Sequence, residues 1–135
     1  MAIAKYSLTA LDCPDPVMLA QFYAKVTDFE VVVSHLDKNG VPLWVELVDN
    51  GVTKIAFQRI DNFLKPTWPV GPVPQQAHLD FDVPNLDVAE QKLLSIGATK
   101  SPIQTSSNPA ENFRVYFDPA GHPFCLVSNT SLTGL

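Results

Sequence analysis

Residues 118–127 have the sequence Asp118-Pro119-Ala120-Gly121-His122-Pro123-Phe124-Cys125-Leu126-Val127. The first four residues are typical of a tight turn, because proline fixes φ and glycine tolerates the positive φ that many turns require. The apolar residues that follow predict a strand at 123–127, and the apolar segment before the turn predicts another at 113–117. We therefore expect the chain to end in two adjacent strands joined by this turn.

The rest of the second half begins with a segment of alternating character. Apolar and polar residues alternate from residue 76 to residue 83, which predicts a strand with His78, Asp80 and Asp82 on its polar face. A helix is expected at 88–96, where Gly97 ends it. A short strand at 98–103 and a polar loop at 104–112 complete a β-α-β-β-β order.

The first half has the same order of predicted elements. A strand is expected at 2–11, and a helix at 17–26 that Asp15 caps and Pro16 begins. Three strands follow, and a hairpin turn lies between the last two of them. Their predicted ranges are 29–33, 43–48 and 53–60. Prolines fill the segment between the halves, and proline belongs neither in a helix nor in a central strand.

These patterns predict a single α+β domain over residues 1–135. It has a first module at about 1–62, a proline-rich linker at about 63–74 and a second module at about 75–128. The two modules share the order of their elements more clearly than their residues, so the repeat is one of architecture.

Three segments carry a family resemblance: Asp15-Pro16 followed by Phe22-Tyr23, the run from His78 to Val83, and residues 118–127. Together they resemble the glyoxalase/bleomycin-resistance/extradiol-dioxygenase (vicinal oxygen chelate) superfamily, and the last segment resembles its glyoxalase-like domain subgroup. The resemblance implies two βαβββ modules, each curling a mixed sheet into half a barrel around a cleft. It also implies, for metal-dependent members, one His, Gln or Glu ligand on each of the first, fourth, fifth and eighth strands.

The chain departs from that ligand pattern. Carried over by position, the four sites fall on Leu8, on Phe57 or Gln58, on His78 and on Cys125. Leucine offers no ligand atom, and Mg²⁺ and Mn²⁺ prefer oxygen donors to a thiol. We therefore expect no metal cofactor. If a divalent metal does bind, His78, Gln58 and Cys125 would hold it, and zinc is the ion that suits them.

His78 and Asp80 form the candidate general-base pair. Histidine exchanges protons near neutral pH, and a neighbouring carboxylate would orient its ring. Two alternatives remain open, namely that His78 is a hydrogen-bonded core histidine and that Asp80 is exposed or salt-bridged. Cys125 lies in an apolar strand, where an inert thiol is more typical than a nucleophile.

Eight residues are predicted to line a ligand pocket: Leu8, Trp44, Phe57, Gln58, Trp68, His78, Phe113 and Cys125. Aromatic residues in strands more often belong to the core. Trp68 differs because it lies in the proline-rich segment, where a large aromatic ring needs a place to be buried, such as the mouth of a cavity. Arg59 and Arg114 could receive an anionic ligand, although roles facing solvent are favoured.

Composition excludes several classes of partner. The net charge is −5 and no cluster of lysine and arginine stands out, so nucleic acid and membrane surfaces are not expected partners. We expect no secretory leader, two reduced thiols at Cys13 and Cys125 rather than a disulfide, and a cytoplasmic location. The expected partners are a small-molecule ligand and, as in many domains of this family, a second copy of the chain in a homodimer.

Two functions are weighed first, and whether the chain is an enzyme stays open between them; a purely structural or partner-binding module is a third possibility. The favoured one is binding of a small apolar or aromatic molecule in the cleft without the usual metal site. The alternative is a lyase, isomerase or oxygenase that uses His78 with a non-standard metal or as an acid/base group.

Overall fold

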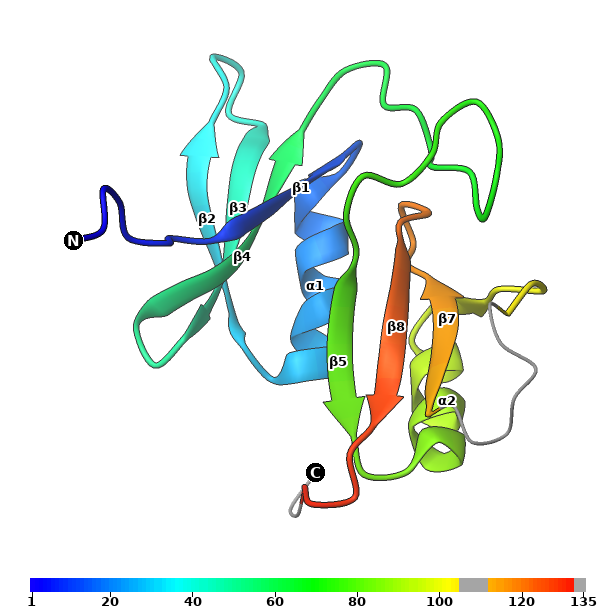
Figure 1. Ribbon diagram of the computed structural model, residues 1–135. Helices are drawn as coiled ribbons and strands as arrows, with labels where there is room; N and C mark the ends of the chain where they lie inside the picture. Colours follow the sequence, from blue (N-terminus) through cyan, green and yellow to red (C-terminus); the bar gives the residue numbers. More distant parts are fainter. Residues whose placement is uncertain (105–111, 133–135) are drawn as a thin grey trace. The chain divides into compact units, whose positions relative to one another are not determined.

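The computed structural model describes residues 1–104 and 112–132, and the chain divides into two compact units, Met1–Phe63 and Leu64–Leu135. Within these described residues, each unit contains one helix and one four-stranded sheet in the predicted β-α-β-β-β order (Figure 1). The α+β class with two βαβββ modules is therefore confirmed. The second unit begins at the start of the predicted linker, and the prediction of a single domain stays a prediction.

The N-terminal unit is a mixed sheet with the strand order β1-β4-β3-β2, in which β1 and β4 are parallel and the other neighbours antiparallel. Its elements are β1 (Thr9–Cys13), α1 (Pro16–Thr27), β2 (Glu30–Leu36), β3 (Pro42–Asp49) and β4 (Val52–Arg59).

Helix α1 forms where the sequence predicts it and covers one face of this sheet (Figure 1). Asp15 caps it by accepting a hydrogen bond from the Met18 amide at 3.1 Å, and Pro16 occupies its first turn. The buried face of the helix includes Tyr23, whose ring stacks on that of Phe57 with centroids 5.7 Å apart. This face of β4 is therefore the core of the N-terminal unit.

The first strand is shorter than predicted and begins later. Only residues 9–13 pair with β4, in parallel register from Thr9 opposite Ile55 to Cys13 opposite Arg59. The apolar residues Ile3 and Tyr6, which suggested a strand from residue 2, are exposed. The alternation of apolar and polar residues at the N-terminus was therefore misleading, because a strand also needs a neighbouring strand with which to form hydrogen bonds.

The C-terminal unit repeats the arrangement with the strand order β5-β8-β7-β6, in which β5 and β8 are the parallel pair. Its elements are β5 (Leu79–Val83), α2 (Leu86–Ser95), β6 (Thr99–Lys100), β7 (Phe113–Phe117) and β8 (Pro123–Ser128). The polar loop predicted at 104–112 falls mostly on residues 105–111, outside the described residues.

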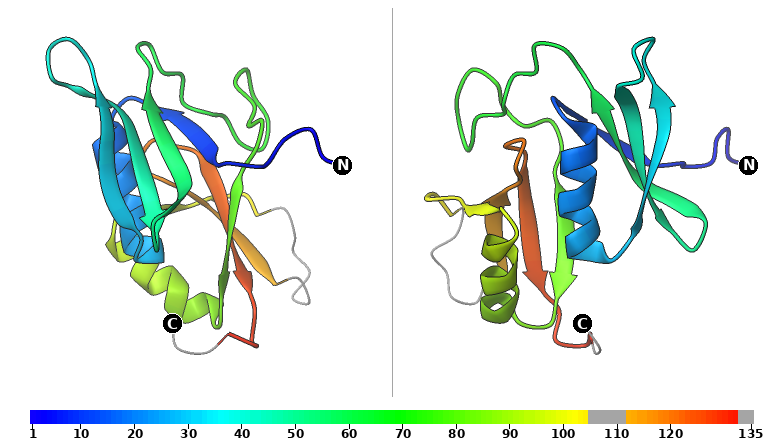
Figure 2. Two further views of the ribbon diagram at one scale, coloured as in Figure 1. Left: turned by 90° about the vertical axis from the view of Figure 1, so that its left-hand side faces the viewer. Right: turned by 180° about the vertical axis from the view of Figure 1, so that it is seen from behind.

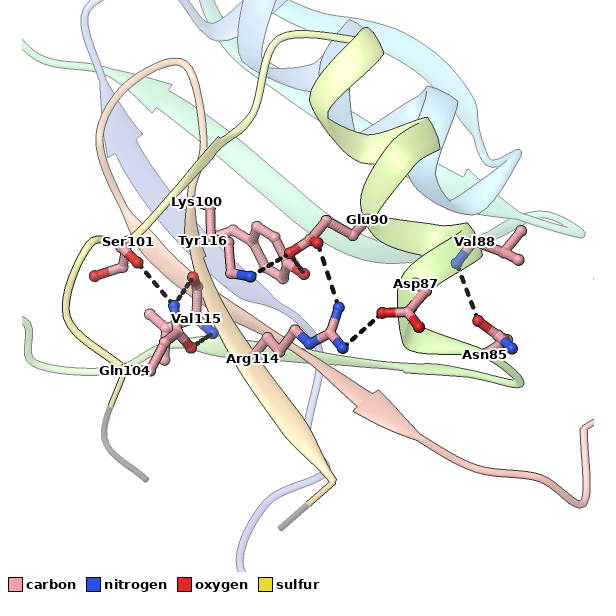
Figure 3. A network of polar contacts seen from close by, with 10 residues as sticks. All are labelled: Asn85, Asp87, Val88, Glu90, Lys100, Ser101, Gln104, Arg114, Val115 and Tyr116. Carbon is pink, nitrogen blue, oxygen red and sulfur yellow. Dashed lines mark hydrogen bonds and ion pairs between the residues drawn. The ribbon is translucent and has the colours of Figure 1, made fainter. Parts of the chain in front are cut away.

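Strand β6 has two residues where six were predicted, because a side chain takes over its pairing role. The carboxamide of Gln104 donates to the Val115 carbonyl oxygen at 3.0 Å and accepts from the Val115 amide at 2.9 Å (Figure 3). The side-chain amide thus forms the same two hydrogen bonds with the edge of β7 that a peptide group of a neighbouring strand would form.

Helix α2 lies against one face of its own sheet (Figure 2). Leu93 is its one fully buried residue. Glu90 instead reaches β6 and β7, where it accepts hydrogen bonds from the Tyr116 hydroxyl at 2.8 Å and from Arg114 at 3.3 Å and pairs with Lys100 at 2.9 Å (Figure 3). Arg114 also pairs with Asp87 at 2.7 Å.

The turn before β8 is built around the buried Asp118. Its carboxylate accepts from the amides of Ala120 at 2.9 Å and His122 at 3.0 Å, and Gly121 has φ +95°. A hairpin this tight starts β8 at Pro123, which in turn fixes where Cys125 lies on the strand. In the described part of the chain, neither helix has the length and apolar character that a membrane crossing requires.

Candidate functional site

The two units correspond strand for strand, and this correspondence locates the site. Strand β1 is followed by Pro14 and the helix cap Asp15, and β5 by Pro84 and the helix cap Asn85. Residues of β5 therefore match residues of β1 that lie 70 positions earlier. By this match His78 corresponds to Leu8, as the family pattern implied.

His78, Asp80 and Cys125 come together in the C-terminal unit. One ligand atom from each side chain lies within 4.8 Å of the others, and Nε2 of His78 is 3.3 Å from Oδ1 of Asp80. The parallel pairing of β5 with β8 sets Asp80 directly opposite Cys125. His78 precedes Asp80 by two residues, and side chains two apart on extended backbone point to the same side.

The cluster lies on the face of the sheet opposite α2. On the helix side, Phe81 packs edge-to-face on Phe124 with ring centroids 6.1 Å apart, and Tyr116 packs beside Phe124 at 5.9 Å. Because alternate residues face opposite sides, Asp80 and Cys125 point away from that core. Phe113 shares their side by register, since β7 pairs Val115 with Cys125 and Phe113 with Val127.

Burial and a neighbouring charge keep the Cys125 thiol protonated. Burial, followed by the negative charge of Asp80 and the hydrogen bond to its carboxylate, raises the pKa of Cys125 to about 11. The thiol therefore donates to Asp80 at neutral pH, and it is a poor nucleophile there. His78 and Asp80 expose 42% and 55% of their side chains, so the cluster can be reached from solvent.

The predicted pocket residues of the N-terminal unit divide between its two faces. Trp44 pairs directly with Gln58 across β3 and β4, and both lie on the face opposite α1. Phe57 is fully buried on the α1 side. Leu8 is half-buried and precedes β1. The position that matches Cys125 is Ala56, because Ala56 pairs with Ala10 as Cys125 pairs with Asp80.

Three other residues that the sequence analysis considered have contacts that do not involve the His78 cluster. Trp68 is half-buried, and its indole Nε1 is buried without a hydrogen-bond acceptor among the described residues. Arg59 pairs with Asp37 at 2.8 Å, and Arg114 belongs to the α2 network (Figure 3). Neither arginine is set aside for an anionic ligand.

Sequence reasoning paired His78 with Asp80 but missed that Asp80 also joins His78 to Cys125. The assignment of Gln58 to a metal set with His78 and Cys125 stays a prediction, and the structure places Asp80 beside His78 and Cys125. The missing information is the parallel register of β5 and β8, which no local pattern reveals.

The donors present do not fit the hard-cation site that the family resemblance implies. A thiol takes the place of an oxygen ligand at Cys125, and Mg²⁺ and Mn²⁺ favour oxygen. The matching positions of the N-terminal unit, Leu8, Ala10 and Ala56, offer no side-chain ligand atom. The four-strand ligand set is thus incomplete in this chain.

Comparisons with known proteins agree with this architecture. The model of a family described as "Glyoxalase-like domain" matches residues 9–127. No curated protein matches the sequence.

Several solved structures share the fold. The fosfomycin resistance protein FosX from Listeria monocytogenes has a TM-score of 0.68 at 18% identity, with 96% of each chain covered. A FosX variant from the same organism was crystallised with Mn(II) and a dihydroxypropylphosphonic acid, with a TM-score of 0.66 at 17% identity over 96% of this chain and 95% of that one. A glyoxalase family protein from Enterococcus faecalis has a TM-score of 0.62 at 20% identity, covering 94% of this chain and 97% of that one.

Proposed function

The chain belongs to the glyoxalase-like domain family of the vicinal oxygen chelate superfamily, and we propose that it binds a small apolar or aromatic molecule without the family's usual four-ligand metal site. The observation that carries this proposal is the cluster of the exposed His78 and Asp80 with the more buried Cys125, on the sheet face that α2 leaves uncovered. A few convergent polar groups beside apolar side chains are typical of small-molecule sites.

Each residue has a distinct role in this proposal. Asp80 holds both the His78 ring and the Cys125 thiol, so it fixes the orientation of the imidazole. The second ring nitrogen of His78, Nδ1, has no hydrogen-bond partner within residues 1–104 and 112–132 and would meet a polar atom of the ligand. Phe113 would supply apolar contact from the neighbouring strand β7.

The predicted pocket residues of the N-terminal unit have less structural support than the cluster around His78. Trp44 and Gln58 share one sheet face, and we propose that they contribute to ligand binding there. Leu8 and Trp68 keep their predicted pocket roles as proposals. Phe57 is set apart, because its ring is committed to the core against Tyr23.

The test is a nuclear magnetic resonance screen of the ¹⁵N-labelled chain with aromatic and apolar fragments. We expect a binding fragment to shift amide signals of residues 78–82 and 123–127, and the shifts to fall at least fivefold in His78→Ala. His35→Ala is the matched control, because His35 is an exposed histidine on β2. Fragments that leave these signals unmoved, or that bind His78→Ala unchanged, would refute the proposal.

A second candidate function is catalysis by a lyase, isomerase or oxygenase mechanism, favoured by the 3.3 Å contact between His78 and Asp80. An imidazole held by a carboxylate can remove a proton from a bound substrate. The same spectra distinguish the two functions, because a catalytic base would exchange a ligand C–H proton for deuterium in D₂O and a binding site would leave it. We further propose a cytoplasmic location, in keeping with the free thiols of Cys13 and Cys125.

A further inference from the structure

We propose that Asn50 is a site of spontaneous deamidation, at which the backbone nitrogen of Gly51 converts the side-chain carboxamide into a carboxylate through a cyclic imide. The site lies at the tip of the hairpin that joins β3 to β4 in the N-terminal unit, whereas the His78 cluster belongs to the C-terminal unit. The inference therefore goes beyond the proposed function and does not depend on it.

The sequence provides two places for this reaction. Asparagine directly precedes glycine at Asn39-Gly40 and at Asn50-Gly51. Glycine has no side chain to shield its backbone nitrogen, so that nitrogen can approach the side chain of the residue before it. All four residues are exposed, so neither exposure nor sequence separates the two sites.

The reaction at Asn50 requires only water. The Gly51 nitrogen forms a bond to Cγ of Asn50, the bond from Cγ to the side-chain nitrogen breaks, and ammonia leaves with the proton that the Gly51 amide gives up. Water then opens the imide ring at one of its two carbonyl carbons. One opening gives aspartate, and the other gives isoaspartate, in which the main chain runs through the former side chain. No oxidation state changes.

The hairpin turn leaves the Gly51 nitrogen accessible. Asn50 and Gly51 have φ +48° and +80°, which are typical of a two-residue hairpin turn. Strand pairing resumes with Asp49 opposite Val52, so the two central residues lie outside the ladder. Within residues 1–104 and 112–132, the Gly51 N–H has no hydrogen-bond acceptor, and apart from its chain neighbours nothing lies within 4 Å of its Cβ position.

Asp37 restrains the other Asn-Gly pair. The Gly40 amide donates to the Asp37 carbonyl oxygen at 3.0 Å, so it must break a hydrogen bond before its nitrogen can attack. The Asp37 carboxylate also accepts from the amides of Asn39 at 2.8 Å and Val41 at 2.9 Å. A segment held by several hydrogen bonds opens less often than one without them. We therefore expect Asn50 to react before Asn39.

Conversion changes both the charge and the backbone of the hairpin. Each event adds one negative charge and takes the net charge of the chain from −5 to −6. Isoaspartate also lengthens the main chain by one carbon inside the turn between β3 and β4, the two central strands of the N-terminal sheet. The isoaspartate form should therefore weaken the pairing of these strands next to the turn.

The test is incubation of the full chain in mildly alkaline buffer at physiological temperature, followed by proteolysis and tandem mass spectrometry. Trypsin releases both sites on one peptide, residues 39–54, so the two conversions are measured on the same molecules. We expect aspartate and isoaspartate to accumulate at least fivefold faster at position 50 than at position 39. In urea, where Asp37 no longer restrains its loop, the two rates should agree within twofold.

Variants separate the causes. Gly51→Ala places a methyl group beside the attacking nitrogen and should slow the conversion of Asn50 at least tenfold, whereas Gly40→Ala, the matched control, should leave it unchanged. Asp37→Ala should speed the conversion of Asn39 at least threefold in the folded chain.

Three results would overturn the inference: an Asn50 that stays intact, equal rates at the two positions in the folded chain, or a fivefold difference that persists in urea. Circular dichroism establishes that each variant is folded. If Gly51→Ala does not fold, the comparison of the folded chain with the chain in urea decides.

Discussion

Gly121 is a single residue on which the geometry of the last turn depends. Its φ is +95°, and a Cβ there would lie 2.5 Å from Cγ of Lys65, whose side chain crosses the turn. Gly121→Ala therefore incurs both backbone strain and a steric clash. We expect this substitution to lower the free energy of unfolding by about 1–3 kcal/mol in urea denaturation.

Gly40→Ala is the matched control for this prediction. Gly40 has φ +77°, but nothing lies within 4 Å of its missing Cβ, so its substitution incurs strain alone. Lys65→Ala in the Gly121→Ala background should recover the part of the loss that comes from the clash. Equal losses for the two glycine substitutions, with no recovery, would show that Lys65 does not constrain the turn.

Part of the candidate site was predictable at this scale. Alternation along residues 76–83 placed His78 and Asp80 on one face, and the turn at 118–121 placed Cys125 on the last strand. Local patterns did not reveal that Ala56, rather than Gln58, is the residue of the first unit that corresponds to Cys125, because this correspondence depends on strand register. Register is set by pairing between segments that are distant in the sequence, and local periodicity carries no information about that pairing.

At the scale of elements, α2 depends on polar contacts for its attachment. Burial raises the pKa of Glu90, but hydrogen bonds and charges from Lys100, Tyr116 and Arg114 outweigh burial, so the net pKa lies below its ordinary value of 4.5. A carboxyl whose pKa is lower in the folded state stabilises the fold above pH 4.5. That stabilisation is lost as the pH falls through the folded-state pKa.

We therefore expect Glu90→Gln to lower the free energy of unfolding at pH 7 by about 1–3 kcal/mol. It should also flatten the loss of stability between pH 7 and pH 3, since the substituted chain no longer takes up this proton. Asp87→Asn is the control, because Asp87 is largely exposed and its ion pair should contribute less than about 1 kcal/mol. Parallel pH profiles for Glu90→Gln and the unaltered chain, from urea denaturation, would contradict this account.

The elements themselves were predicted unevenly, for physical reasons. Helix α1 was foreseeable because Asp15, Pro16 and the apolar spacing all favour the same helix. Strand β6 was not, because a carboxamide of Gln104 replaces backbone pairing, and no propensity encodes that exchange. The early start predicted for β1 failed because residues 2–8 have apolar character without a partner strand.

At the scale of the whole molecule, the order of elements sufficed to predict a duplicated fold. The match between the units survives at the prolines and caps that begin the helices, Pro14 with Pro84 and Asp15 with Asn85. Core residues diverged because apolar side chains of similar volume replace one another at small cost. The duplication is therefore visible in turns and caps more than in the core.

We expect the chain to form a homodimer. Strand β2 is an edge strand, and Val33 and Leu36 on it are exposed, a combination that favours association through the edge. Sedimentation equilibrium should give about twice the chain mass of 14.8 kDa, and Leu36→Asp should shift the equilibrium toward single chains. A mass of one chain at micromolar concentration would contradict the prediction.

The parallel pairing of β5 with β8 has a consequence for the order of events during synthesis. These neighbouring strands come from opposite ends of the amino-acid sequence of the second unit. The ribosome therefore releases His78 and Asp80 long before Cys125. A nascent chain that lacks its last strand would hold His78 and Asp80 with nothing opposite them. The cluster of the three side chains would then form only when the C-terminal unit is finished.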